Sequence, residues 1–147
     1  MPNKRVEWRH SGKRLILPVA IMPRDDADNR FETFRTHGLL DTGATGTGLR
    51  PDAAEYLSLT SQGRRRIETA NGILWASEYV IRVGLFAGDL GPDGAGNTGQ
   101  MPYVLDGHFI GFELPAGFTY PVLIGMDVIS QCDLHVLRDG TAQIDLP

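Results

Sequence analysis

The chain has 147 residues, a length that suits a single domain built around one hydrophobic core. Hydrophobic residues make up 41% and charged residues 22%, a composition typical of a soluble globular protein rather than a disordered one. The net charge of −4 argues against nucleic acid as a partner, because binding to a phosphate backbone needs a basic surface.

The N-terminal residues 1–12 are polar and charged and contain no apolar core of a signal peptide. No apolar run approaches the roughly 18 residues that a membrane span needs, so we expect no membrane partner. Cys132 is the single cysteine, which excludes an internal disulfide and fits a reducing compartment. These features together predict a cytoplasmic protein.

Eighteen glycines, nine prolines and many short β-branched runs predict an all-β fold with frequent turns. In chain order, strands are expected at residues 14–22, 31–40, 65–69, 73–85, 103–113, 122–124, 133–137 and 141–146. The clearest alternation of a half-buried strand sets Tyr79, Ile81 and Val83 against Val80, Arg82 and Gly84.

Short helices are expected at residues 51–57 and 126–131. Pro51 suits the first position of the earlier helix, and Asp52 favours its positive N-terminal end. Asn71-Gly72 and Asp139-Gly140 predict tight hairpin turns, because these dipeptides adopt the positive φ angles that such turns require. The glycine-rich residues 87–100 are expected to form a long surface loop.

The most informative segment is residues 37–45, where an apolar strand ends abruptly in Asp41, Thr42 and Gly43. Gly43 would let the backbone turn sharply, so that the carboxylate of Asp41 faces a cleft rather than the core. Thr42 would hold this turn through a hydrogen bond to nearby backbone. The tripeptide alone favours an ordinary turn over a functional motif, since all three residue types are common in turns.

A second segment, residues 122–129, is an apolar strand that ends in Gly125 and is followed by a short helix opened by Asp127. The pairing of Leu-Leu-Asp-Thr-Gly-Ala with this later Leu-Ile-Gly-Met-Asp-Val-Ile resembles the retropepsin-like aspartic protease family, and the arginine-rich composition hints at a bacterial member. The resemblance covers residues 14–147, with residues 1–13 left as a polar N-terminal extension. It implies an acid-protease lobe, an all-β closed barrel or sandwich with one or two short helices.

The resemblance also implies a set of functional residues. Asp41, Thr42 and Gly43 would form the catalytic motif, with the apolar strand of the second segment crossing behind it. The hairpin turn near Asn71 lies where the family places its flap, a hairpin that folds over bound substrate. The residues expected to contact substrate are Ala44, Thr45, Thr69, Ala70, Asn71 and Gly72.

Peptide hydrolysis by an aspartic protease needs two carboxylates that share one proton. The sequence contains Asp-Thr-Gly once, and Asp139-Gly140-Thr141 has these residue types in the wrong order. We therefore expect a homodimer in which each copy supplies Asp41, because a two-fold contact repeats itself. The expected function is a homodimeric aspartic endopeptidase that acts on a peptide or protein substrate. The family pattern also implies that residues 15–19 and 144–146 contribute to the shared interface.

The chain departs from the family at one ion pair. Family members usually continue the motif with acidic residues that pair with an arginine of the later helix, whereas here Thr45, Gly46 and Met126 occupy those places. Loss of both partners can be nearly neutral, while loss of one is costly. Near the hairpin turn, Trp75 is predicted to pack against a neighbour rather than to close over substrate.

Two alternatives stay open: a catalytically silent protease-like module that binds peptides, and a half-lobe that pairs with a different protein. Other chemistries have little support in the sequence. The histidines show no metal-binding spacing, so no metal and no cofactor are expected. Ser130 and Cys132 lack the context of a catalytic nucleophile, and residues 91–99 lack the Lys-Ser/Thr ending of a phosphate loop.

Overall fold

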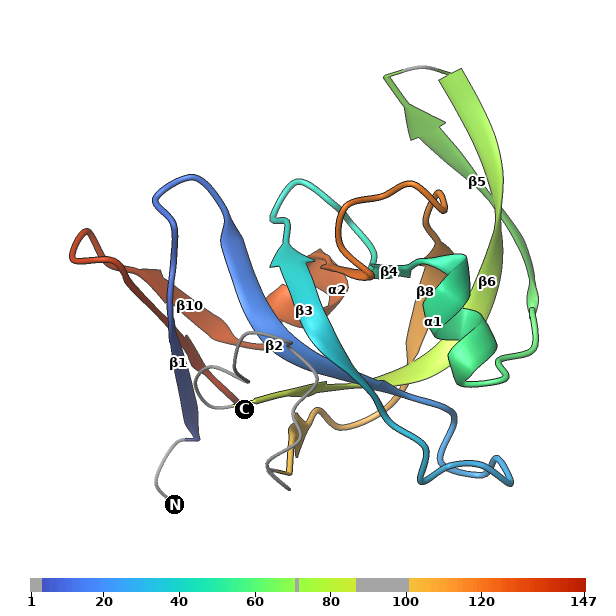
Figure 1. Cartoon of the computed structure of the whole chain (residues 1–147), viewed down its shortest axis with the longest axis horizontal. Helices are drawn as coiled ribbons and strands as arrows, with labels where there is room; N and C mark the ends of the chain where they lie inside the picture. Colours follow the sequence, from blue (N-terminus) through green and yellow to red (C-terminus); the bar gives the residue numbers. More distant parts are fainter. Residues whose placement is uncertain (1–3, 71, 87–100) are drawn as a thin grey trace.

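The computed structural model describes residues 4–70, 72–86 and 101–147. The strands are β1 (Arg5–Arg9), β2 (Leu15–Met22), β3 (Phe34–Leu40), β4 (Gly48–Leu49), β5 (Gly63–Thr69), β6 (Gly72–Leu85), β7 (Tyr103–Val104), β8 (Phe109–Glu113), β9 (Val122–Ile124), β10 (Asp133–Val136) and β11 (Thr141–Asp145). The helices are α1 (Pro51–Tyr56) and α2 (Met126–Ile129), as Figure 1 shows. The prediction of an all-β fold with two short helices is confirmed. In the described part of the chain, neither helix has the length to cross a membrane.

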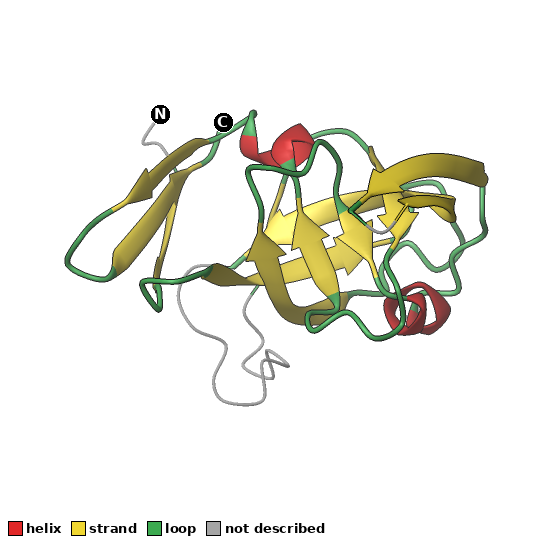
Figure 2. Ribbon diagram, turned by 90° about the horizontal axis from the view of Figure 1, so that it is seen from above, coloured by secondary structure: helices red, strands yellow, loops and turns green. Residues whose placement is uncertain are grey.

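Eight of the strands form a sheet that closes into a barrel. Its order is β2-β3-β9-β4-β8-β6-β5, with β7 beside β6. Because β2 also pairs with β6, from Val19↔Leu85 to Met22↔Arg82, the ring closes between these two strands. Figure 2 shows the strands curving around a common interior. The strand β5 lies outside the closed ring and forms, with the first half of β6, a hairpin that projects from the barrel (Figure 1).

The barrel interior is filled by alternate residues of its strands. Tyr79, Ile81 and Val83 of β6 are buried, as their spacing predicts, whereas Val80 and Arg82 are only half-buried. Further buried members of the same core are Leu17, Val19, Ile21, Leu49, Phe109, Val122 and Ile124. Closure of the ring leaves few free strand edges around this core.

A second, three-stranded sheet has the order β1-β11-β10 and lies beside the barrel (Figure 1). The strand β1 lies within the segment expected to be a polar extension, and no strand was predicted before residue 14. In β1, the side chains of Val6 and Trp8 are buried in the main core, while Arg5, Glu7 and Arg9 face solvent. The alternation of Val6 and Trp8 with these three charged residues is the pattern of a half-buried strand, although it spans only five residues.

Both predicted hairpins are present, because β5 pairs with β6 and β10 with β11 in antiparallel fashion. Thr69 pairs with Gly72, which has a φ of 119°, and Asn71 lies outside the described residues. Gly140 has a φ of 93° in the turn that joins β10 to β11. The strand predicted over 103–113 is instead divided into β7 and β8, because Gly107 between them has a φ of 82°. The loop predicted over 87–100 lies outside the described residues.

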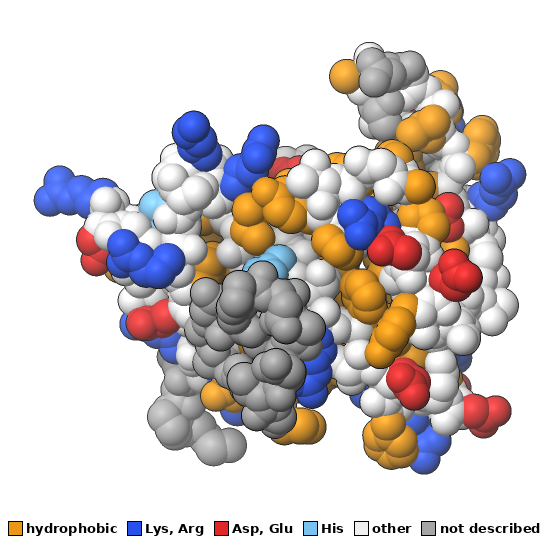
Figure 3. Space-filling model, in the orientation of Figure 1, with side chains coloured by type: hydrophobic (Ala, Val, Ile, Leu, Met, Phe, Trp, Pro, Cys, Tyr) orange, Lys and Arg blue, Asp and Glu red, His pale blue; other side chains and the backbone are white. Residues whose placement is uncertain are grey.

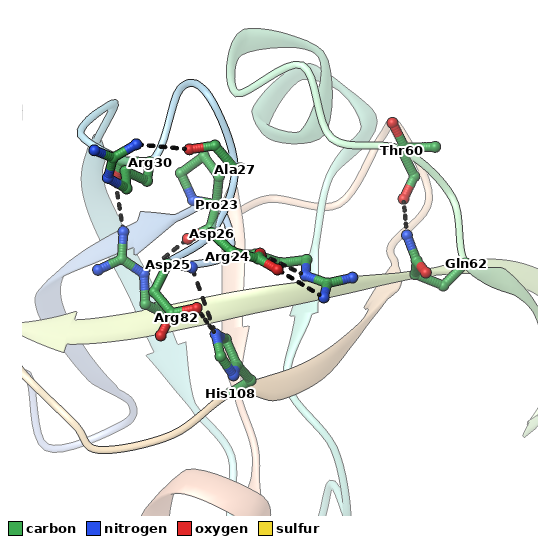
Figure 4. Close-up of polar contacts among 10 residues, drawn as sticks. All are labelled: Pro23, Arg24, Asp25, Asp26, Ala27, Arg30, Thr60, Gln62, Arg82 and His108. Atoms are coloured by element: carbon green, nitrogen blue, oxygen red, sulfur yellow. Dashed lines mark hydrogen bonds and ion pairs between the residues drawn. The ribbon is translucent and has the colours of Figure 1, made fainter.

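The loop between β2 and β3 is tied to one end of the barrel. Arg82 donates from Nε to the carbonyl oxygen of Pro23 at 2.8 Å and from Nη2 to that of Arg30 (Figure 4). Nearby, His108 Nε2 lies 3.2 Å from Asp25 Oδ1. Since β3 runs away from this loop, its C-terminal residue lies at the opposite end of the barrel.

Candidate active site

Asp41 directly follows β3, at the end of the barrel where the parallel strand β9 also ends. The pairing of Leu40 with Ile124 brings the two strand ends together. The Asp41 N–H donates to the carbonyl oxygen of Ile124 at 2.9 Å, and its own carbonyl oxygen accepts from the Ala44 N–H at 3.2 Å. The side chain is half-buried, and its Oδ1 accepts the Gly43 N–H at 2.8 Å. A tight turn therefore fixes the direction of this carboxylate.

Gly43 lies in the sharp turn that the sequence predicts, where the Ala44 N–H donates to the carbonyl oxygen of Asp41 at 3.2 Å. The turn does not use a positive φ angle at Gly43. A Cβ at this position would lie 3.2 Å from Asp41 Oδ1, closer than side-chain carbons normally approach other atoms. A side chain at position 43 would therefore crowd the Asp41 carboxylate, which would have to shift by a few tenths of an ångström.

The segment after Gly43 rests against the start of α2. Met126 N–H donates to the carbonyl oxygen of Ala44 at 2.8 Å, and Asp127 N–H donates to that of Thr45 at 3.2 Å. A Cβ on Gly125 would lie only 2.3 Å from the carbonyl oxygen of Gly46. The second sequence segment therefore passes against the loop that follows Asp41, and Gly125 permits this close approach.

Thr47 and Asp127 form a hydrogen-bond network behind this loop that the sequence analysis missed. The hydroxyl of the fully buried Thr47 donates to Asp127 Oδ1 at 2.8 Å and accepts from the Gly125 N–H at 3.2 Å. The Thr47 N–H donates to Asp127 Oδ2 at 3.1 Å, and the Val128 N–H donates to Oδ1 at 2.9 Å. Bonds to an ionised carboxylate are stronger than neutral ones, so this network rigidly joins the loop to α2.

The sequence marks each of these two residues only by nearby glycines. Thr47 lies between two glycines, and Asp127 follows Gly125 by two positions. Nothing in either local pattern points to the other residue, because the two lie 80 positions apart. Their pairing appears only when β4 and β9 are placed side by side.

The structure separates the predicted substrate-contacting residues into two groups. Ala44, half-buried, and Thr45, exposed, lie in the loop that follows Asp41. The other group, Thr69, Ala70 and Gly72, lies at the tip of the β5–β6 hairpin, which projects apart from the end of β3 in Figure 1.

The prediction that Trp75 packs against a neighbour is wrong for this hairpin. Its side chain is 61% exposed, and Ile73 on the same strand face is also exposed. The projecting half of β6 has no second layer against which these two side chains could pack.

A cavity of about 410 Å³ opens beside Asp41. Its walls include Leu39, Val136 of β10, and residues of the turn between β1 and β2, among them Lys13 and Arg14. This volume falls within the range of small-ligand pockets, roughly 300–1,000 Å³. Within residues 4–70, 72–86 and 101–147, no three His, Cys, Asp or Glu side chains gather in a way that would hold a metal ion.

Comparison with known proteins supports the fold. No family model matches the sequence, and no curated protein is similar to it. Among solved structures, the chain is similar to the crystal structure of a retropepsin-like aspartic protease from Rickettsia conorii, with a TM-score of 0.64 and 13% sequence identity. The match covers 99% of this chain and 92% of that one. The chain therefore has the retropepsin-like aspartic protease fold.

Proposed function

We propose that this protein is a homodimeric aspartic endopeptidase in which each copy contributes Asp41. The observation that carries the proposal is the placement of this carboxylate. It stands at the end of the barrel, beside a cavity, and is oriented by the Gly43 N–H at 2.8 Å. The fold it stands in is shared with a protein described as a retropepsin-like aspartic protease.

The reaction follows from two carboxylates that hold one proton between them. Like charges about 3 Å apart cannot both ionise easily, so one group stays protonated while the other is charged. The charged carboxylate takes a proton from a water molecule, whose oxygen attacks the carbonyl carbon of the peptide bond. The protonated carboxyl donates its proton to the carbonyl oxygen, which gives a tetrahedral diol. Transfer of a proton to the leaving nitrogen then breaks the C–N bond.

One chain cannot supply both groups. The sequence contains Asp-Thr-Gly once, and a two-fold axis next to Asp41 would bring the same residue from a second copy. The peptide would lie between the loop at Ala44 and Thr45 and the inner face of the β5–β6 hairpin. The hairpin tip at Thr69, Ala70 and Gly72, with Asn71, would cover it.

Cleavage by the purified protein, with Asp41→Asn as the inactive variant, tests the proposal. We expect wild type to cut an unfolded peptide pool at mildly acidic pH and to be blocked by a statine-type inhibitor. Asp41→Asn should abolish cleavage without changing the sedimentation coefficient, whereas Asp139→Asn, in the turn between β10 and β11, should leave cleavage intact. A dimer that cuts nothing between about pH 3 and 7 would instead favour a peptide-binding module. A monomer would favour a half-lobe that pairs with another protein.

A further inference from the structure

The turn between β1 and β2 presents two cations at the cavity beside Asp41. Lys13 and Arg14 are exposed and line this cavity together with the Asp41 carboxylate. Figure 3 shows Lys and Arg side chains at the upper left of the view, where Figure 1 places this turn. The turn therefore places positive charge next to the candidate catalytic group.

The backbone of this turn is well braced. The Ser11 hydroxyl oxygen accepts the N–H of Lys13 at 3.2 Å and that of Arg14 at 3.1 Å. His10 accepts the Gly12 N–H on Nδ1 at 3.0 Å and donates from Nε2 to the carbonyl oxygen of Leu137 at 2.8 Å. Because the turn is tied to the β10–β11 hairpin in this way, both cations are carried on a fixed support.

Neither cation is neutralised by the described part of the chain, where no acidic group lies within ion-pair distance of Lys13 or Arg14. Other arginines do have acidic partners. Arg65, which also approaches the catalytic loop, lies with its Nη2 3.0 Å from Glu78 Oε2. The lysine and arginine side chains that line the cavity together with Asp41 are thus those of the β1–β2 turn.

We infer that Lys13 and Arg14 form a basic subsite that selects peptides with an acidic side chain close to the scissile bond. This inference rests on the proposed function. In the proposed dimer, two copies would bring four cations to a pair of carboxylates that together hold one proton. The excess of positive charge favours an anionic side chain over its neutral amide, and the guanidinium of Arg14 can bind a carboxylate through two parallel hydrogen bonds.

The strength of the preference for an acidic side chain depends on how exposed Lys13 and Arg14 are. Exposed ion pairs contribute little and are screened by salt, whereas partial enclosure by a bound peptide strengthens them. We therefore expect kcat/KM to be about three- to tenfold higher for a peptide with Glu than for the same peptide with Gln at the preferred position. This ratio should shrink when the salt concentration rises from about 0.05 M to about 0.5 M.

Matched peptides that differ only by Glu or Gln at one position, scanned across the cleavage site, test this inference. The variants are Lys13→Gln, Arg14→Gln and the double variant. Arg24→Gln is the control, because it removes the same charge from the loop at the opposite end of the barrel, where Arg24 pairs with Asp26 (Figure 4). The double variant should lower the Glu/Gln ratio to about one, while Arg24→Gln keeps the wild-type ratio.

A wild-type ratio near one at every position would overturn the inference, as would a ratio that survives the double variant or falls equally in Arg24→Gln. A double variant that weakens the dimer but keeps the ratio would assign these cations to the subunit contact instead. Binding of the labelled peptides to Asp41→Asn, followed by fluorescence anisotropy, measures the same preference without cleavage. If wild type cuts no peptide, the proposed function fails, and the anisotropy ratio still decides whether the subsite selects acidic side chains.

Discussion

Thr47→Val tests the network that holds the candidate catalytic loop against α2. Valine keeps the shape of threonine but has no hydroxyl, so the 2.8 Å bond to Asp127 is lost and the Gly125 N–H loses its acceptor. A hydrogen bond to a charged group contributes about 1.5–3 kcal/mol, and a buried donor left without a partner costs about 1–3 kcal/mol. Because these terms overlap, we expect the free energy of unfolding to fall by about 2–4 kcal/mol.

Urea unfolding followed by tryptophan fluorescence measures this change, since Trp8 is buried in the core. The midpoint should fall at an unchanged m-value. Thr47→Ser keeps the hydroxyl and removes one buried methyl, so it should cost only about 1 kcal/mol. Thr45→Val, at an exposed position of the same loop, should stay within about 0.5 kcal/mol of wild type. A Thr47→Val protein as stable as Thr45→Val, or a Thr47→Ser protein as unstable as Thr47→Val, would refute the reasoning.

Three further changes probe other parts of the fold. Gly125→Ala would place a Cβ 2.3 Å from a backbone carbonyl oxygen, so we expect urea unfolding to show a free energy of unfolding lower by about 3 kcal/mol or more. Gly117→Ala, with open space around it, should lower this free energy by less than about 1 kcal/mol. Equal losses in the two variants would contradict the close approach at Gly125. The hydrogen bond from Arg5 lowers the pKa of Asp145 to about 2, so this carboxylate stabilises the fold above its ordinary pKa of 3.8 and loses that effect as the pH falls towards 2. Asp145→Asn should therefore lower the melting temperature at neutral pH and match wild type near pH 2, and a difference independent of pH would refute this. Val6→Ala should lower the free energy of unfolding by about 2 kcal/mol, because the fully buried Val6 side chain contributes to the main core. An unchanged free energy of unfolding would show that β1 is dispensable for stability.

Features encoded by neighbouring residues could be predicted from the sequence. The strand β9 was predicted with its exact bounds, because Val122–Ile124 is a short apolar run between turn residues. The turn at Gly140 was predicted because an Asp-Gly dipeptide favours the positive φ that is found there. The abrupt end of β3 before Asp41 could also be predicted, since an apolar strand is followed at once by three turn-forming residues.

Features that depend on distant residues could not be predicted. The strand β1 acquires its partner from the other end of the chain, where Val6 pairs with Ile144. The strand β4 has two residues and takes its conformation from β8 and β9 on either side. The exposure of Trp75 also follows from the tertiary fold, because a sequence does not show that the hairpin projects beyond the layer that would have covered it.

The departure from the family's acidic residues after the motif has a physical explanation in the β5–β6 hairpin. A Cβ at Gly46 would lie 3.0 Å from Arg65 Nη1 and 3.8 Å from the ring of Phe112, so the guanidinium occupies the space that a side chain at position 46 would need. Arg65 is balanced by Glu78 on the neighbouring strand, at 3.0 Å, rather than by an acid in the loop. Positions 45 and 46 carry no carboxylate, and Lys13 and Arg14 of the β1–β2 turn line the cavity with Asp41. Within this loop, an acidic peptide therefore meets repulsion only from Asp41 itself.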